Sequence, residues 1–157
     1  MDIKDYLVGA GIEFQLYTHS AVFTCEEAEN CKEYKSIKGI HSKNLFLKDR
    51  KARRFYLIIM PIDKKLDLSE IEKISGDKIK FGNEDELKSI LGLSKGSVSP
   101  FGLINDSEHK TIVYIDKIVW ESEYVSFHPN INTQTIGLTG ENFQKYIKKV
   151  GNIYKVV

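Results

Sequence analysis

The sequence lacks several features that would place it in a large functional class. No apolar run in its 157 residues approaches the roughly 18 that a membrane-spanning helix requires. Residues 1–5 include three charged side chains and lack the apolar stretch of a secretion signal. Dinucleotide and P-loop fingerprints are absent, as is the Gly-x-Ser-x-Gly elbow of many serine hydrolases. We therefore expect a cytoplasmic protein with no membrane association.

Charge, cysteine and clustered metal ligands are equally scarce. The formal net charge is only +1, so any contact with RNA must come from a local basic patch. Cys25 and Cys31 are too few for a disulfide framework and are interpreted as reduced structural thiols. The four histidines lie far apart, without the short spacing that joins two metal ligands: His19, His41, His109 and His128. We expect neither a metal nor a cofactor.

Apolar periodicity and capping signals predict a mixture of helices and strands. The 41% hydrophobic and 29% charged composition suits one ordinary globular domain over residues 1–157. Helices are predicted to begin after Asp2, Thr24, Asp67, Asn83 and Thr139, with Gly92 and Gly151 ending two of them. Strands are predicted at 14–17, 44–48, 54–60, 111–115, 124–127, 133–137 and 153–157. The order favours an α/β (α+β) fold with a mixed, partly antiparallel sheet flanked by helices.

Three short clusters could carry chemistry. In "SKNLFL" (42–47), Lys43 and Asn44 stand where a turn becomes an apolar strand, either as a snorkelling lysine or as a donor aimed into a cleft. "GSVSPFGL" (96–103) is either a turn crossing the core or a wall of backbone N–H groups for an anion or carbonyl oxygen. "FHPNINTQT" (127–135) is either a polar turn or the rim of a binding site.

A basic hairpin tip adds a fourth candidate. It is either a solvated tip or a phosphate contact, and its cations are Lys48, Arg50, Lys51, Arg53 and Arg54.

Taken together and in this order, the three clusters resemble the YbaK/ProX superfamily of aminoacyl-tRNA deacylases. These are free-standing relatives of the editing domain inserted in bacterial prolyl-tRNA synthetases. The resemblance covers essentially the whole chain. Within the superfamily, the sequence is most similar to the ProXp-ala (PrdX) branch, which removes alanine wrongly attached to proline tRNA.

The resemblance implies a role for each matching residue. Lys43 would hold the terminal adenosine and the ester, Gly102 would point an N–H at the ester carbonyl, and His128 would bound or polarise the pocket. The remaining substrate-binding positions implied by the motifs, with Phe46, Phe101 and Leu103 as apolar walls, are Asn44, Phe46, Gly96, Ser97, Val98, Ser99, Pro100, Phe101, Leu103 and Asn130. The basic hairpin has no assigned role in the family, and we interpret it as a contact for tRNA phosphates.

The implied activity is trans-editing hydrolysis of mischarged Ala-tRNA(Pro), assisted by the 2′-hydroxyl of the substrate. Such a reaction needs no protein nucleophile or metal, because the ester is already activated. The alternatives are a deacylase for Cys- or Ser-tRNA, and a non-catalytic regulator that binds amino acids or charged tRNA. An unrelated metal hydrolase is a third. Prolyl-tRNA synthetase and an elongation factor are candidate partners beside tRNA(Pro).

Overall fold

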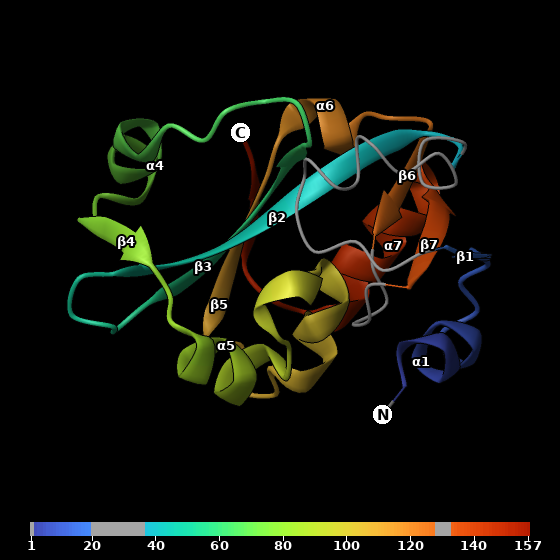
Figure 1. Cartoon of the computed structure of the whole chain (residues 1–157), viewed down its shortest axis with the longest axis horizontal. Helices are drawn as coiled ribbons and strands as arrows, with labels where there is room; N and C mark the ends of the chain where they lie inside the picture. Colours follow the sequence, from blue (N-terminus) through green and yellow to red (C-terminus); the bar gives the residue numbers. More distant parts are fainter. Residues whose placement is uncertain (1, 20–36, 128–132) are drawn as a thin grey trace.

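The longest strand, β2 (Ile40–Asp49), organises the fold because two separate sets of strands pair with it (Figure 1). The computed structural model describes residues 2–19, 37–127 and 133–157. Within them the strand order is β1-β7-β6-β2-β3-β5-β8, and β4 also pairs with β2. The other strands are β1 (Gln15–Thr18), β3 (Phe55–Pro61), β4 (Ile79–Phe81), β5 (Thr111–Ile115), β6 (Tyr124–Phe127), β7 (Gln134–Thr139) and β8 (Tyr154–Val156). Both parallel and antiparallel pairs occur along this order, so the predicted mixed α/β sheet is confirmed.

One edge of β2 is open in its middle. On one side β3 pairs with β2 from Ser42 to Lys48. On the other side β6 pairs only with Ile40 and His41, and β4 only with residues 47–49. Residues 42–46 therefore have no partner strand on this edge within the described ranges.

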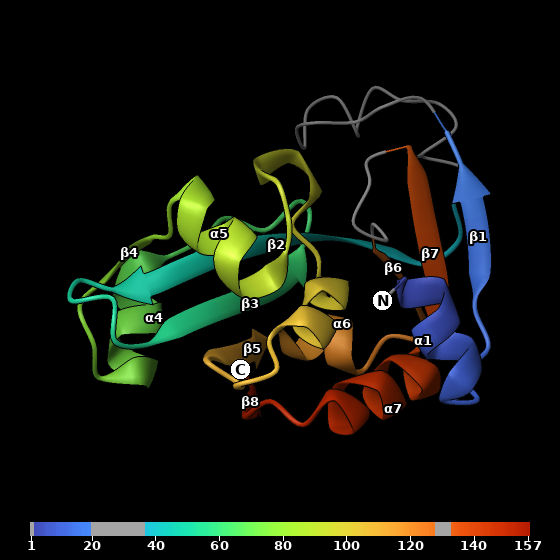
Figure 2. The same ribbon diagram turned by 90° about the horizontal axis from the view of Figure 1, so that it is seen from below.

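The two faces of the sheet carry separate hydrophobic clusters. The larger one joins Phe46, Leu57 and Ile59 to α1 (Ile3–Gly9), α5 (Glu84–Leu91), α6 (Lys117–Trp120) and α7 (Gly140–Val150). The smaller one joins Leu47 and Ile58 to α4 (Leu68–Ser75). Figure 2 shows α4 and α5 on opposite sides of the β2–β3 pair. Strand β2 is thus packed on both faces, which agrees with its consecutive apolar residues 45–47.

Most predicted helix ends are confirmed. Asp2, Asp67, Asn83 and Thr139 all accept a backbone N–H as N-caps, and Asn83 forms a full capping box with Glu86. Gly92 and Gly151 end their helices with φ of 68° and 84°, a conformation that glycine adopts without strain. The helix predicted after Thr24 and both cysteines lie outside the described residues.

Four short elements were not predicted. They are β4, α6 and the 3₁₀ helices η1 (Lys95–Ser97) and η2 (Pro100–Asn105). Each has three to six residues, which is too short for a periodic pattern. No helix in the described ranges is long and apolar enough to cross a membrane.

The start of η2 is held to α7 by one buried hydrogen bond. The Tyr146 hydroxyl, from α7, donates to the Pro100 carbonyl oxygen at 2.8 Å. Tyr146 is fully buried, and its ring packs edge-on against Phe101 with centroids 5.4 Å apart. Burial raises the pKa of Tyr146 well above its ordinary value, so the hydroxyl stays protonated as a donor.

We therefore predict that Tyr146→Phe destabilises the protein by about 1–3 kcal/mol, because the buried Pro100 carbonyl loses its partner. Urea unfolding at neutral pH measures the change. Tyr154→Phe is the control, because the hydroxyl of the partly buried Tyr154 makes no hydrogen bond within the described part of the chain. Equal stability of the two variants would contradict the assigned role of the hydrogen bond.

Candidate active site

A pocket of about 600 Å³ lies at the open edge of β2. Three consecutive strand residues line it, namely Asn44, Leu45 and Phe46. Successive side chains of a strand point to opposite faces, so three in a row can share a pocket only where it faces the strand edge. The opposite wall comes from Phe81 at the end of β4, the first turn of α5, and Lys95 and Val98 of the loop. The pocket thus joins "SKNLFL" to the outer part of "GSVSPFGL".

Asn44 offers polar groups to this pocket from both its side chain and its backbone. Its Oδ1 is buried and has no hydrogen-bond partner among the residues that the structure describes. The Phe46 carbonyl, two residues on, accepts outward from the Gly82 N–H at 3.0 Å, whereas the His41 carbonyl accepts from Ile62 on the β3 side. Because backbone groups alternate in direction along a strand, the N–H and C=O of Asn44 point outward into the gap. Asn44 therefore presents both a side-chain amide and a main-chain N–H to the pocket.

Lys43 lies beside the gap but on the other face of the strand from Asn44. It pairs with Met60, whereas Asn44 pairs with Ile59. Lys43 is partly buried and shares its face with Leu45 and Leu47. Its role in the site stays a prediction.

The inner half of the predicted loop forms part of the core. Phe101 and Leu103 are 0% and 2% exposed, and Phe101 packs on Phe127 at 5.8 Å between centroids. Ser99 is fully buried and caps η2 by accepting from the Phe101 N–H at 3.1 Å. Ser99, Phe101 and Leu103, with Pro100 buried beside them, do not line the pocket at the open edge of β2, and their contacts with substrate stay predictions. Val98 does line the pocket, while contacts of Gly96 and Ser97 with substrate stay predictions.

Gly102 has a packing role instead of a catalytic one. Its N–H already donates to the Ser99 carbonyl at 3.2 Å. A Cβ at this position would lie 2.9 Å from the Leu91 carbonyl oxygen and 2.6 Å from Leu93 Cδ1. The structure gives no support to the prediction that Gly102 points its N–H at the ester, because that N–H is used within η2. Glycine is needed here for close packing against α5.

The basic hairpin divides into paired and free cations. Lys48 is only 8% exposed and forms an ion pair with Glu86 at 2.5 Å, so the structure gives no support to the prediction that it contacts phosphate. Arg53 pairs with Asp49 at 3.3 Å and Arg54 with Asp77 at 3.4 Å. Arg50 and Lys51 are exposed at the tip and belong to no ion pair within the described ranges.

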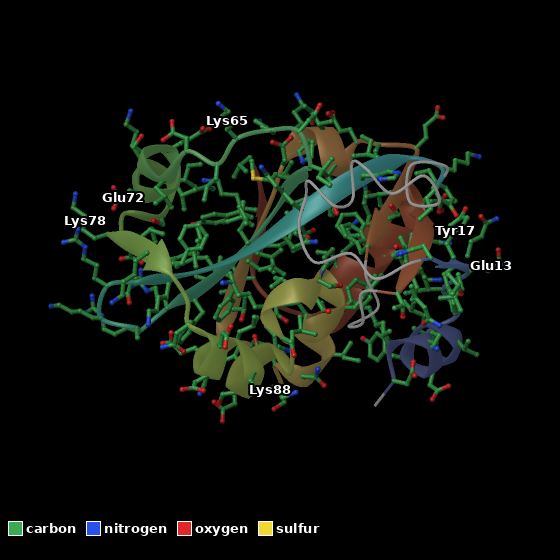
Figure 3. All side chains as sticks on the ribbon, in the orientation of Figure 1. Glu13, Tyr17, Lys65, Glu72, Lys78 and Lys88 are labelled. Atoms are coloured by element: carbon green, nitrogen blue, oxygen red, sulfur yellow. The ribbon has the colours of Figure 1, made fainter. Side chains whose placement is uncertain are left out.

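Strand β4 brings two further cations that sequence reasoning missed. The exposed side chains of Lys78 and Lys80 flank the hairpin, and Figure 3 shows Lys78 projecting from this end of the molecule. The Arg50 N–H donates to the Lys78 carbonyl at 2.9 Å, which joins the two segments. The signal available in the sequence was the alternation Lys78-Ile79-Lys80.

His128 and Asn130 lie outside the described residues, so their predicted contacts stay predictions. Their segment begins where β6 ends, at Phe127. Elsewhere, in the ranges that the structure covers, no three His, Cys, Asp or Glu side chains gather as a metal site.

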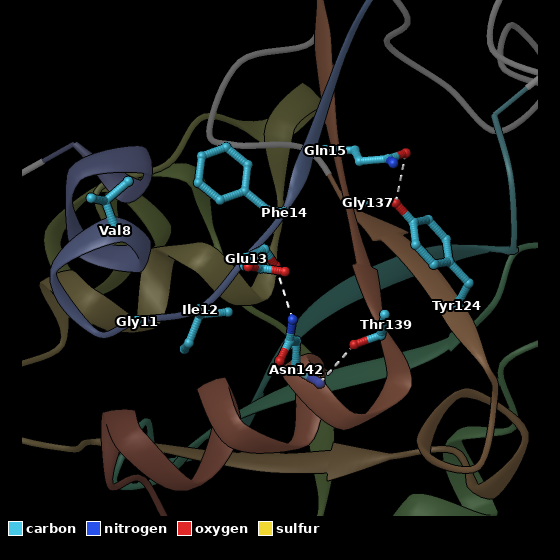
Figure 4. A pocket seen from close by; sticks show the side chains of 10 residues that line it. All are labelled: Val8, Gly11, Ile12, Glu13, Phe14, Gln15, Tyr124, Gly137, Thr139 and Asn142. Carbon is cyan, nitrogen blue, oxygen red and sulfur yellow. Dashed lines mark hydrogen bonds between the residues drawn. The ribbon is translucent and has the colours of Figure 1, made fainter.

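A second pocket, of about 650 Å³, lies between α1, β1 and α7 and contains none of the predicted residues (Figure 4). Several of its polar groups are already paired. Asn142 Nδ2 donates to the Glu13 carbonyl at 3.1 Å, and the Tyr124 hydroxyl donates to Gln15 Oε1 at 3.1 Å. Burial, with a hydrogen bond to Tyr17, raises the pKa of Tyr124 to about 12. We find no reactive group there and assign the site to the open edge of β2.

Fold and pocket together define a mixed α/β ligand-binding domain whose site lies at a gap in the sheet. Residues 19–146 match the family described as the aminoacyl-tRNA editing domain. The chain belongs to this family, and it is an aminoacyl-tRNA deacylase, a hydrolase of ester bonds. The resemblance to the YbaK/ProX superfamily is thereby confirmed.

Similar proteins agree with this assignment. The chain is 39% identical to the prolyl-tRNA editing protein ProX of Acetoanaerobium sticklandii over 147 residues, covering 93% of this chain and 88% of the relative. It is 32% identical to the prolyl-tRNA synthetase associated domain-containing protein 1 of Xenopus laevis, covering 85% and 81%. A solved structure proposed to be a trans-editing enzyme for prolyl tRNA synthetase superposes with a TM-score of 0.73 at 15% identity, covering 98% and 92%. That last similarity shows the fold alone.

The packing around Gly102 predicts that Gly102→Ala lowers stability by about 1–3 kcal/mol, because the added methyl meets the backbone of Leu91. Thermal unfolding measures the loss. Gly9→Ala is the matched control, since a Cβ there meets nothing within 4 Å. A Gly102→Ala protein as stable as the control would show that the contact relaxes freely.

The Lys48–Glu86 pair predicts acid-dependent stability. Burial alone would raise the pKa of Glu86, but hydrogen bonds from the Asn83 N–H and the Lys48 ammonium outweigh it and lower the pKa below 4.5. The stabilisation is therefore complete above this ordinary value and is lost as the pH falls through the lower folded value. We expect Glu86→Gln to flatten the fall in stability between about pH 6 and pH 3, measured by urea unfolding.

The control for this experiment is Glu121→Gln, which alters an exposed carboxylate away from the pocket. An acid profile of Glu86→Gln identical to that of the control would overturn the assigned coupling.

Proposed function

We propose that the chain removes alanine in trans from mischarged tRNA(Pro). The observation that carries this proposal is the pocket at the open edge of β2, which Asn44, next to Lys43 in the sequence, and the loop residue Val98 both line. Among the described residues, the buried Asn44 amide oxygen has no hydrogen-bond partner. The motifs "SKNLFL" and "FHPNINTQT" are most similar to the alanine-specific branch. The Acetoanaerobium sticklandii relative carries the name of a prolyl-tRNA editing protein.

The chemistry asks little of the protein, because an aminoacyl ester is already activated. Water attacks the carbonyl carbon, the ester C–O bond to the terminal ribose breaks, and the proton from water ends on the released hydroxyl. The 2′-hydroxyl of the substrate, as the resemblance implies, assists the attacking water. The protein has to position the ester and stabilise the oxyanion that develops on the carbonyl oxygen.

We assign these tasks to the residues at the gap. The outward N–H of Asn44 takes the oxyanion role that Gly102 cannot perform, because the Gly102 N–H is already used. The Lys43 ammonium holds the ribose end of the substrate. Asn44 Oδ1 accepts a hydrogen bond from a substrate donor and thereby gains the partner that it lacks.

Selection for alanine follows from size. The proline pocket of a prolyl-tRNA synthetase cannot strongly reject a smaller side chain, because each missing methylene is worth only about 1–3 kcal/mol of binding free energy. A second and smaller site can exclude proline by overlap. Val98 and the largely buried Phe46 supply apolar walls for such a site.

We expect Ala-tRNA(Pro) to be hydrolysed faster than Cys-, Ser- or Pro-tRNA(Pro), with activity unaffected by excess chelator. Lys43→Ala lowers the rate on Ala-tRNA(Pro) by about a hundredfold or more, the usual cost of removing one positioned donor. Initial rates with radiolabelled amino acids measure both. Lys65→Ala is the control, because this exposed lysine lies before α4 and away from the pocket (Figure 3).

Two outcomes would overturn the proposal. Faster cleavage of Cys- or Ser-tRNA would assign the chain to another specificity. Binding of charged tRNA without turnover, with Lys43→Ala altering affinity alone, would indicate a regulator.

A further inference from the structure

Phe81 is a large aromatic side chain left 55% exposed at the end of β4. A single exposed apolar residue needs no explanation. Phe81 differs because it lines the pocket at the open edge of β2, together with the charged residues Glu84 and Lys95. An aromatic face beside a cation is the composition of a site for a nucleobase and its phosphate.

The position of Phe81 is fixed by its neighbours. Phe81 pairs with Leu47, and the next residue, Gly82, donates its N–H to the Phe46 carbonyl at 3.0 Å. A Cβ on Gly82 would collide with the Phe46 ring, so glycine lets the end of β4 lie against β2. The Phe81 ring is therefore held on a rigid backbone, which limits the entropy lost when a ligand stacks on it.

The register also places Phe81 correctly relative to Lys43. Leu47, Leu45 and Lys43 alternate along β2 and share a face, and Phe81 lies on that face because it pairs with Leu47. The Lys43 and Leu47 positions are four residue steps apart, about 13 Å along the strand. A nucleoside lying across this interval would present its base to Phe81 and its ribose to the long Lys43 side chain.

The ligand follows from the reaction class. Every aminoacyl-tRNA ends in an adenosine whose ribose carries the amino acid, so a deacylase that grips this end meets one base with every substrate. Glu84 can accept from the adenine 6-amino group, and Lys95 can pair with the terminal phosphate. The exposed Lys80 on β4 continues the cationic surface toward Lys78 and Arg50, in the direction of the remaining acceptor strand.

We propose that Phe81 is the stacking platform for the 3′-terminal adenine of the aminoacyl-tRNA. The inference takes the identity of the ester from the proposed function. The binding position of the adenine base is inferred from the residues that line the pocket. Phe81 acts as a substrate-binding residue and takes no part in cleaving the bond.

The first experiment measures kcat and KM on Ala-tRNA(Pro). We expect Phe81→Ala to raise KM about tenfold or more with little change in kcat, because stacking on an aromatic ring is lost. Phe81→Trp restores the low KM. Ile118→Ala is the matched control, since Ile118 is also 55% exposed but lies outside the pocket.

The second experiment does not depend on turnover. Uncharged tRNA(Pro) with 2-aminopurine at its 3′ end should lose fluorescence on binding the wild type, Phe81→Trp and Ile118→Ala, but not Phe81→Ala at saturating protein. Quenching that depends on Phe81 supports the stacking platform even if no alanine ester is cleaved, in which case the proposed function alone fails. Unchanged KM and undiminished quenching with Phe81→Ala would overturn the inference.

Discussion

The site depends on a gap in the pairing of β2. Backbone N–H and C=O groups of a sheet must find partners, and an open edge is normally avoided or covered. Here β2 is buried on both faces and paired at both ends, so it cannot slip to close the gap. The unpaired groups of Asn44 are therefore held in place and directed into a pocket. A strand that is rigid along its length but open in its middle can bind a ligand without first rearranging.

The charged residues around this gap serve two purposes that the net charge of +1 conceals. Lys48 and Glu86 are largely buried and paired, and together with the capping box they attach α5 to β2. Lys78 and Lys80 remain exposed beside the hairpin tip and are suited to phosphate, whose binding relies on cations that can release counterions. Lysine thus has two roles at neighbouring positions. Lys48 stabilises the fold, whereas Lys80, its partner in the β2–β4 register, faces solvent.

Local signals predicted the local structure. Caps such as Asn83 and stops such as Gly151 were read correctly because a cap depends on residues within one turn. The gap could not be predicted, because it depends on which strands pair with β2 from distant parts of the chain. Gly102 shows the same limit: sequence could not separate close approach to a substrate from close approach to Leu91, since both require a missing Cβ. The family motifs located the pocket through Asn44 and Val98, but only packing distinguishes the wall of a site from its support.

The loop at 96–103 lines the pocket with its outer part and lies in the core with its inner part. This arrangement gives the pocket a stiff wall. Its outer residue Val98 faces the pocket, while Phe101 and Leu103 are buried and the Pro100 carbonyl is held by Tyr146. A sieve that excludes a larger amino acid works only if its wall resists displacement, since a wall that yields lets the larger side chain enter at small cost. Anchoring the inner half in the close-packed core transfers the stiffness of the core to the pocket. In the proposed function, discrimination by size depends on these buried inner residues, because they set how far the wall can move.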